Sequence, residues 1–342
     1  MAENNRNTRR VAIACQGGGS HTAFTAGALK KLLKEKEHEY EIVALSGTSG
    51  GSICALLAWY GLLMNDTNKA VELLDSFWQD NSANSFQDRI LNDWLLRTNR
   101  FFGSIGGTPT VSPYVTPASS WASDQLKSML ERHVDFGRIE ELVKPSSPIL
   151  LIGAADVVSG EFKAFSSHRD TINVDMVLAS AALPTLFKAV HTNGGVYWDG
   201  LFSQNPPVRE LPDAKPDEIW VIQIDPQKRA AEPKTMPDIM DRRNELAGNL
   251  SLYQEIYFIE KINEWVAKGV LSGTKHEIIE VKWIEMLRDL DSESKLNRDP
   301  RFLQGMMAYG EDQAEAFLNE DRNEPTPGPL DNGSLRSPEP SP

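Results

Sequence analysis

The sequence predicts an α/β fold with a mostly parallel central sheet and helices on both faces. Strand-like and helix-like segments alternate through the first third of the chain. An apolar strand at 11–15 precedes a helix at about 22–36, and a strand at 40–45 precedes a helix at 52–64. Such alternation is typical of parallel strands joined by crossover helices. A chain of 342 residues is long enough for one large domain or two small ones with a sizeable core.

The later segments continue this pattern and suggest a division of the chain. Strands are expected at 148–155, 161–166 and 219–224, and helices at 67–78, 175–182, 238–266 and 300–318. The tail is rich in proline and almost free of apolar residues, which is typical of disorder. We therefore expect a flexible N-terminus (1–9), a main domain (10–225), a helical C-terminal extension (226–322) and a disordered tail (323–342).

One segment of the main domain, residues 77–121, is unusually aromatic. It holds Phe77, Trp78, Phe86, Trp94, Phe101, Phe102, Tyr114 and Trp121, with Gly, Pro, Ser and Asn between them. Such a segment fits a cap whose aromatic side chains line an apolar pocket. It fits a small satellite core under a surface excursion equally well.

Composition and charge restrict the classes of partner. The 35 basic and 48 acidic residues give a net charge of −13, which disfavours binding to nucleic acid or to an anionic membrane surface. Two cysteines, Cys15 and Cys54, make neither a disulfide framework nor a four-ligand zinc site, so we expect buried thiols and no metal. No secretory signal or membrane span is recognisable. We expect a cytoplasmic protein whose membrane contact, if any, is peripheral.

The stretch Gly47-Thr48-Ser49-Gly50-Gly51 fits the pattern G-x-S-x-G between a strand and a helix. In a nucleophile elbow, a serine on a tight strand-to-helix turn projects its hydroxyl above the sheet, and small neighbours permit the strained turn. Ser49 is therefore a candidate nucleophile. The alternative is a glycine-rich loop with no chemical role.

A second glycine-rich stretch, Gln16-Gly17-Gly18-Gly19-Ser20-His21, lies between the first strand and the first helix. Glycines there leave backbone N–H groups free at a helix N-terminus, where negative charge is favoured. These groups could form an oxyanion hole. A dinucleotide site is the weaker interpretation, because Thr22 stands where that fingerprint needs its third glycine. A tight turn without chemistry is the third alternative.

The third candidate is Asp199-Gly200, which follows the apolar pair Tyr197-Trp198. A carboxylate at a strand end can accept the proton of a serine, although an isolated Asp-Gly is most often a plain turn. A Ser–Asp–His triad is less favoured. The elbow comes too early in the chain for an α/β-hydrolase, and His276, the one histidine after Asp199, lies in a charged segment.

Taken together and in this order, the three stretches resemble the patatin-like phospholipase family. Two further stretches, 179–187 and 200–207, are similar to that family, and residues 242–249 resemble the C-terminal extension of some of its bacterial members. The resemblance implies a three-layer α/β/α patatin-like fold and a Ser49–Asp199 dyad. It implies an oxyanion hole from the N–H groups of Gly17 to Gly19, with Gly50 as an addition. The motif residues Gly47, Gly51, Gly200 and His21 support this site.

The implied activity is hydrolysis of a lipid ester, such as a phospholipid, lysophospholipid or acylglycerol, without metal or organic cofactor. An inactive lipid-binding or scaffolding protein of the same fold and an acyltransferase are the alternatives. The chain departs from the family pattern at Gln16, usually Asp, and at His21, usually Arg or Lys. It departs also at Thr22, usually Gly, and at Leu201, usually Gly or Ala. None of these departures removes a group that the reaction needs.

Overall fold

A computed structural model describes residues 8–83, 112–115, 117–184, 186–229, 231–272, 276–288, 290 and 292–323. The N-terminal part alternates strands and helices as expected. Its elements are β1 (Arg9–Cys15), the 3₁₀ turn η1 (Gly19–Thr22), α1 (Ala23–Glu39), β2 (Tyr40–Thr48), α2 (Gly50–Leu63) and α3 (Thr67–Asn81). Apart from Glu41, the β2 side chains are all buried, as expected for a strand covered on both faces.

The remaining elements complete the sheet and its covering helices. The middle of the chain forms α5 (Pro117–His133), η2 (Phe136–Arg138), α6 (Ile139–Leu142), β3 (Ile149–Asp156), β4 (Phe162–Ser166), α7 (Val174–Ser180), β5 (Val190–Thr192), β6 (Gly195–Asp199), η3 (Gly200–Phe202) and η4 (Leu211–Ala214). The C-terminal part forms β7 (Glu218–Gln223), α8 (Met236–Ala267), β8 (Glu280–Glu285), η5 (Ser292–Leu296) and α9 (Pro300–Asn323).

In the described part of the chain the strands form one mixed sheet in the order β5-β6-β3-β2-β1-β7-β8, with β4 also paired to β3. Neighbours from β3 through β8 in this order run parallel, whereas β4, β5 and β6 add antiparallel pairs. The carboxyl ends of β1, β2, β3 and β7 therefore meet at one edge of the sheet. In open α/β sheets this edge is where ligands bind.

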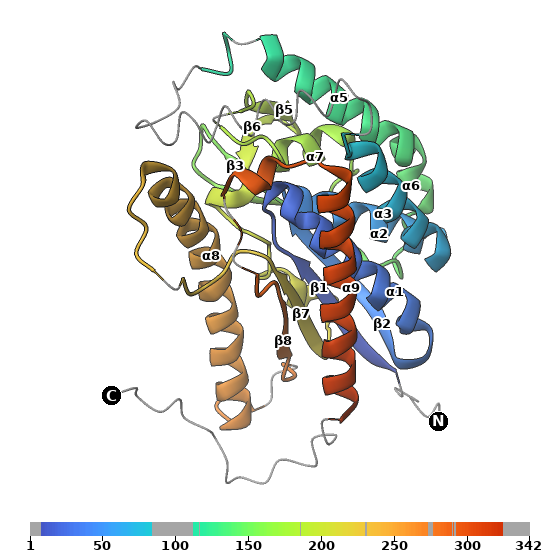
Figure 1. Ribbon diagram of the computed structural model, residues 1–342. Coiled ribbons are helices and arrows are strands. Elements are labelled where there is room, and N and C mark those ends of the chain that lie inside the picture. Colours follow the sequence, from blue (N-terminus) through green and yellow to red (C-terminus); the bar gives the residue numbers. More distant parts are fainter. Residues whose placement is uncertain are drawn as a thin grey trace.

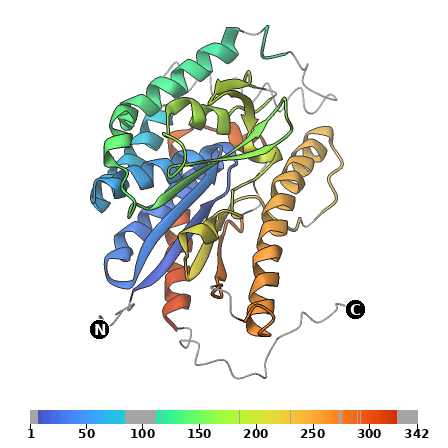
Figure 2. The same ribbon diagram turned by 180° about the vertical axis from the view of Figure 1, so that it is seen from behind.

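Helices cover both faces of the sheet. Helices α1, α2, α3 and α9 pack on one face in the larger hydrophobic cluster (Figure 1). On the opposite face, Leu252, Ile256 and Ile259 of α8 pack against β1, β3 and β7 (Figure 2). Helix α9 lies along α1 at close range, because Gly27 faces the backbone of Met307 and Gly310 faces that of Phe24. The three layers confirm the α/β/α fold class.

The C-terminal extension, the aromatic segment 77–121 and the tail differ in how far the structure describes them. The C-terminal extension includes the helices α8 and α9, and it also contributes β8, a strand that the sequence pattern did not predict. Phe77 and Trp78 of the aromatic segment are buried in α3, whereas residues 84–111, which carry four of its aromatic side chains, lie outside the described residues. The proposed tail beyond residue 323 lies outside them too.

Candidate active site

Ser49 occupies a strained turn between β2 and α2. Its φ is 54° and its ψ is −130°, and a positive φ is uncommon for a residue other than glycine. Such strain persists only where the surroundings enforce it, and it is often found at functional sites. Here the Ser49 N–H donates to Oγ of Ser180 on α7 at 2.9 Å, and the Ser49 carbonyl accepts bonds from Ser52 and Ile53 at the start of α2. The turn has the geometry of the predicted nucleophile elbow.

Asp199 ends β6 beside this turn. Asp199 is only 3% exposed, and its side chain accepts a hydrogen bond of 2.9 Å from the backbone N–H of Leu201 and interacts with the side chain of Ser49. Burial raises the pKa of Asp199 to about 7, and the interactions with Leu201 and Ser49 lower it only in part. The structure thus brings together the two residues that were singled out from motifs 150 positions apart in the sequence. A buried carboxylate that titrates near neutral pH is suited to accept a proton from a hydroxyl.

The glycine loop between β1 and η1 lies directly against the elbow. A Cβ atom on Gly17 would overlap the Thr48 carbonyl oxygen and would come within 2.9 Å of Cβ of Ser49, so no larger residue fits there. The Gly17 N–H donates to Oδ1 of Asn205 at 2.7 Å. Within the described residues, the N–H groups of Gly18, Gly19 and Gly50 have no hydrogen-bond acceptor. These three are the donors that remain for an oxyanion.

The motif glycines Gly47, Gly51 and Gly200 serve close packing. A Cβ on Gly47 would overlap the Gly51 backbone, and one on Gly51 would overlap the Cys15 carbonyl. Gly200 packs on Gly153, where an added Cβ would lie 2.6 Å from the carbonyl oxygen. These contacts hold the elbow, the glycine loop and the Asp199 loop together at one edge of the sheet.

His21 is buried in η1, with 2% of its surface exposed. Its Nε2 lies 2.6 Å from Oγ of Ser294, and its ring packs near Phe302. The side chain therefore belongs to the interface between the glycine loop and the C-terminal extension.

The sequence motifs do not indicate the roles of Ser180 and Asn205, which bond to the backbone N–H groups of Ser49 and Gly17. Both residues lie in the stretches that resemble the family, 179–187 and 200–207, but nothing within these stretches shows which backbone groups they contact. Among the described residues, no cluster of three or more His, Cys, Asp or Glu side chains is arranged to bind a metal ion. None of the helices in the described ranges is both long and apolar enough to cross a bilayer.

A serine at a strained elbow, a buried carboxylate beside it and backbone N–H groups without acceptors are together typical of serine hydrolases. Residues 13–212 match the model of the patatin-like phospholipase family. The chain belongs to that family, as the resemblance implied, and this membership supports a lipid hydrolase function.

A sequence search of curated proteins gave no significant match. Among solved structures, the chain is similar to VipD from Legionella pneumophila, with 14% identity and a TM-score of 0.45, over 92% of this chain and 67% of that one. It is also similar to the type III effector protein ExoU, with 15% identity and a TM-score of 0.36, over 92% of this chain and 53% of that one. A complex of ExoU with SpcU from Pseudomonas aeruginosa gives 12% identity and a TM-score of 0.35, over 92% of this chain and 51% of that one.

Proposed function

We propose that the protein is a serine esterase that hydrolyses lipid esters, of phospholipase A or lysophospholipase type, with Ser49 and Asp199 as a catalytic dyad. The observation that carries the proposal is the position of the buried Asp199 carboxylate beside the Ser49 side chain, an interaction that lowers the pKa of the carboxyl group. Family membership supplies the substrate class. Neither a metal nor an organic cofactor has a role in this mechanism.

In the proposed first half-reaction, Oγ of Ser49 attacks the ester carbonyl carbon while Asp199 accepts the hydroxyl proton. The carbonyl oxygen becomes an oxyanion, which the N–H groups of Gly18 and Gly19 stabilise, with Gly50 as an addition. The Gly17 N–H is already bonded to Asn205, so we assign it to loop anchoring. Asp199 then transfers the proton to the alcohol as it leaves.

In the second half-reaction, water attacks the acyl-enzyme and Asp199 accepts a proton from it. The same N–H groups stabilise the second oxyanion, and collapse of this intermediate releases the fatty acid and restores the Ser49 hydroxyl. A pKa of about 7 lets one carboxylate act as base in each attack and as acid in each departure.

The proposal is tested with the full chain on a p-nitrophenyl ester and on a phospholipid. Ser49→Ala should abolish hydrolysis of both and block labelling by a fluorophosphonate, while the protein stays folded, because only a hydroxyl is removed. Ser76→Ala, a serine-to-alanine change on α3, is the matched control and should label and turn over as the wild type does.

Undiminished labelling of Ser49→Ala would remove Ser49 from the mechanism. A wild type that binds lipid vesicles but hydrolyses neither substrate would favour the scaffolding alternative. New acylated products on addition of an alcohol or a coenzyme A thioester would favour the acyltransferase.

A further inference from the structure

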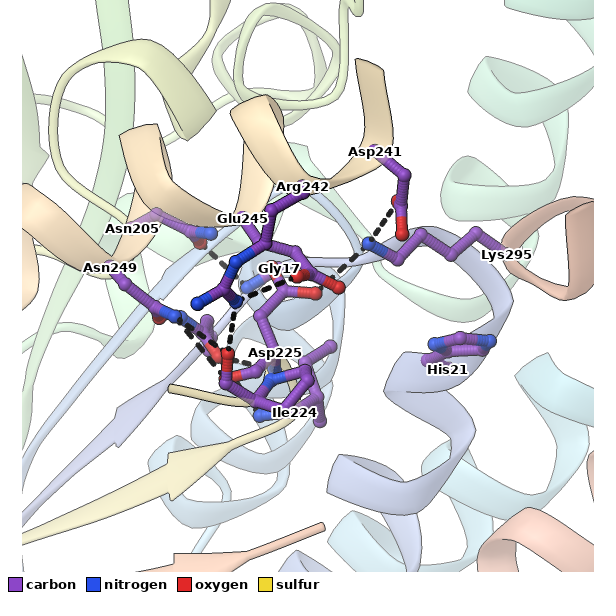
Figure 3. A network of polar contacts seen from close by, with 12 residues as sticks. Gly17, His21, Asn205, Ile224, Asp225, Asp241, Arg242, Glu245, Asn249 and Lys295 are labelled. Atoms are coloured by element: carbon purple, nitrogen blue, oxygen red, sulfur yellow. Dashed lines mark hydrogen bonds and ion pairs between the residues drawn. The ribbon is translucent and has the colours of Figure 1, made fainter. Parts of the chain in front are cut away.

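One face of α8 carries polar side chains that point into the protein rather than toward solvent. They come from the segment 242–249 and the residue before it, and their spacing places them on successive turns: Asp241, Arg242, Glu245 and Asn249 (Figure 3). Asp241, Glu245 and Asn249 are all buried. Long polar side chains are seldom buried unless they are paired, so this face needs partners from elsewhere in the chain.

Asn249 finds its partner in the residue before the glycine loop. Its Oδ1 accepts a hydrogen bond of 2.8 Å from Nε2 of Gln16 and a longer one, 3.3 Å, from Nε2 of Gln223. Its Nδ2 donates to the carbonyl of Pro226 at 3.3 Å. Asn249 thus joins α8 to the ends of both β1 and β7.

Gln16 also bonds to the backbone of the segment after β7, which lies beside the glycine loop. Its side chain is fully buried, and its Oε1 accepts hydrogen bonds from the N–H groups of Ile224, at 2.9 Å, and Asp225, at 2.8 Å. The Gln16 N–H in turn donates to Ile222. Each polar group of this amide is therefore paired, and the next residue is Gly17.

The segment after β7 is held against α8 by charged groups. Arg242 donates to the carbonyls of Pro226, at 3.0 Å, and Gln227, at 2.7 Å. Arg229 forms ion pairs with Asp241 and Glu245. These contacts hold the segment after β7 against α8, next to Gln16.

The turn η5 packs against the glycine loop on the side opposite Gln16 and Asn249. Nζ of Lys295 lies 3.0 Å from Asp225 and 3.1 Å from Asp241 (Figure 3). A Cβ on Gly19 would overlap the Lys295 carbonyl oxygen, so the turn rests on the loop backbone. The glycine loop is therefore enclosed between two elements that both belong to the C-terminal extension.

From these contacts we propose that Asn249 is a positioning residue of the oxyanion hole, acting through Gln16 to hold the glycine loop against Ser49. Helix α8 is then part of the catalytic apparatus rather than an appendage. This inference rests on the proposed function. Three consecutive glycines have wide conformational freedom, and a displacement of about 1 Å at a reacting centre can cost about 100-fold in rate.

The test compares Asn249→Ala and Gln16→Met in the full chain on a soluble p-nitrophenyl ester. Each should lower kcat by about 10- to 100-fold, less than the roughly 100- to 1,000-fold cost of removing an oxyanion donor outright, while KM changes little. The double variant should lose less than the product of the two single losses, because both remove the same hydrogen bond between Gln16 and Asn249. Asn244→Ala on the same helix, a residue outside this network, is the matched control and should leave kcat unchanged.

Two further measurements separate positioning from mere stability. A trifluoromethyl ketone adds to the serine as an oxyanion, so its inhibition constant should rise by the factor by which kcat/KM falls. Asn249→Asp keeps an acceptor for Gln16 but turns a carboxylate oxygen toward the Pro226 carbonyl, so it should lose stability and yet keep more activity than Asn249→Ala. A folded Asn249→Asp with a loss of kcat as large as that of Asn249→Ala would overturn the proposal.

The remaining outcomes are equally decisive. If Asn249→Ala does not fold, Gln16→Met tests the same bond from the loop side, and if neither folds, the pair is structural and the proposal fails. Full activity in Asn249→Ala, with a wild type whose hydrolysis depends on Ser49, overturns this inference alone. A wild type without Ser49-dependent hydrolysis overturns the proposed function instead.

Discussion

The backbone N–H of Gly17 donates a hydrogen bond of 2.7 Å to Oδ1 of Asn205, so this N–H of the glycine loop already has an acceptor within the protein. Asn205 lies 188 residues later in the chain, beyond the Asp199 loop. One side chain thus connects the loop expected to stabilise the oxyanion with the loop that carries the proposed base. A change at Asn205 should affect catalysis although, within the described part of the chain, no hydrogen bond joins this residue to Ser49 or Asp199.

Asn205→Ala should lower kcat about 10-fold or more, because the Gly17 N–H loses its acceptor and the loop loses an anchor. Asn205→Asp keeps an acceptor at the same place and should be affected less. Steady-state kinetics on a soluble ester measure both. If Asn205→Ala were faster than wild type, the freed Gly17 N–H would be serving the oxyanion, and the assignment of donors would have to change.

The pKa of Asp199, raised to about 7 by burial, predicts the pH dependence of activity. Only the carboxylate accepts the Ser49 proton, so kcat/KM should rise with pH through about 7 and then level off. Asp199→Asn should lower the rate by about 10²–10⁴-fold and should abolish this step. Asp124→Asn on α5 is the exposed control. A loss as large in His276→Ala would point to a triad instead.

The same pKa predicts how stability changes with pH. The folded Asp199 holds its proton up to about pH 7, whereas the ordinary value is 3.8. Between these values the folded state binds more protons than the unfolded state, so this residue lowers stability as pH rises toward 7. Asn carries no charge. Asp199→Asn should therefore be more stable than wild type above pH 7, by a margin that shrinks as pH falls toward 4.

The positions of several strands and the tight turn at Ser49 could be predicted from the sequence because both leave local signals. Runs of apolar residues indicated β1, β2 and β7, and the residues around Ser49 indicated its turn. Strand β8 was not predicted, because it has no run of consecutive apolar residues. It lies at the edge of the sheet, where charged residues such as Glu280 and Lys282 alternate with apolar ones, as is typical of a strand with one exposed face.

The partners of the glycine loop could not be predicted for a different reason. Asn249 lies 233 residues after Gln16, and nothing within either stretch indicates that the two side chains meet. Only the packing of α8 across the end of β7 brings them together. Long-range polar contacts of this kind depend on the whole fold, whereas motifs depend on neighbours in the chain.

His21 should act in packing rather than in recognition of a substrate phosphate, because it is buried against Ser294. His21→Ala should lower the free energy of unfolding by about 1–3 kcal/mol, because a buried hydrogen bond and the packing of the ring against Phe302 are lost. The ratio of activity on a phospholipid to that on a neutral ester should stay flat in His21→Ala and His21→Arg. A ratio that rises in His21→Arg would mean that this position senses phosphate.

Two glycine-to-alanine changes should shift stability in opposite directions. In Gly51→Ala, the added Cβ overlaps the Cys15 carbonyl and lies 2.6 Å from that of Gln16, so the start of α2 must move. Overpacking of this kind costs about 1–3 kcal/mol. Gly305 lies in α9 with open space around its Cβ position, so Gly305→Ala should add about 0.5–1 kcal/mol through helix propensity. Urea unfolding measures both changes. A Gly51→Ala variant as stable as wild type would contradict the tight packing of Gly51 against the carbonyls of Cys15 and Gln16.

Lys295→Met should destabilise the protein in a pH-dependent way. Burial alone would lower the pKa of Lys295, yet the carboxylates of Asp225 and Asp241 raise it above its ordinary value, so the ammonium is charged at neutral pH. Removing it leaves two largely buried carboxylates without this partner, which costs about 3–5 kcal/mol when a buried pair is broken. Burial already raises the pKa of Asp225 despite Lys295. Without the lysine it should rise further, and the variant should regain stability as Asp225 takes up a proton.

The measurement is urea unfolding of wild type and Lys295→Met at pH 7.5 and at pH 5.5. The deficit should be larger at pH 7.5, because the uncompensated charge is present there and is neutralised as pH falls. Lys295→Arg keeps the charge and should lose less stability than Lys295→Met. Lys34→Met, at an exposed position on α1, is the control for the loss of a lysine. A deficit that is equal at the two pH values would show that η5 is held by packing rather than by the ion pairs of Lys295.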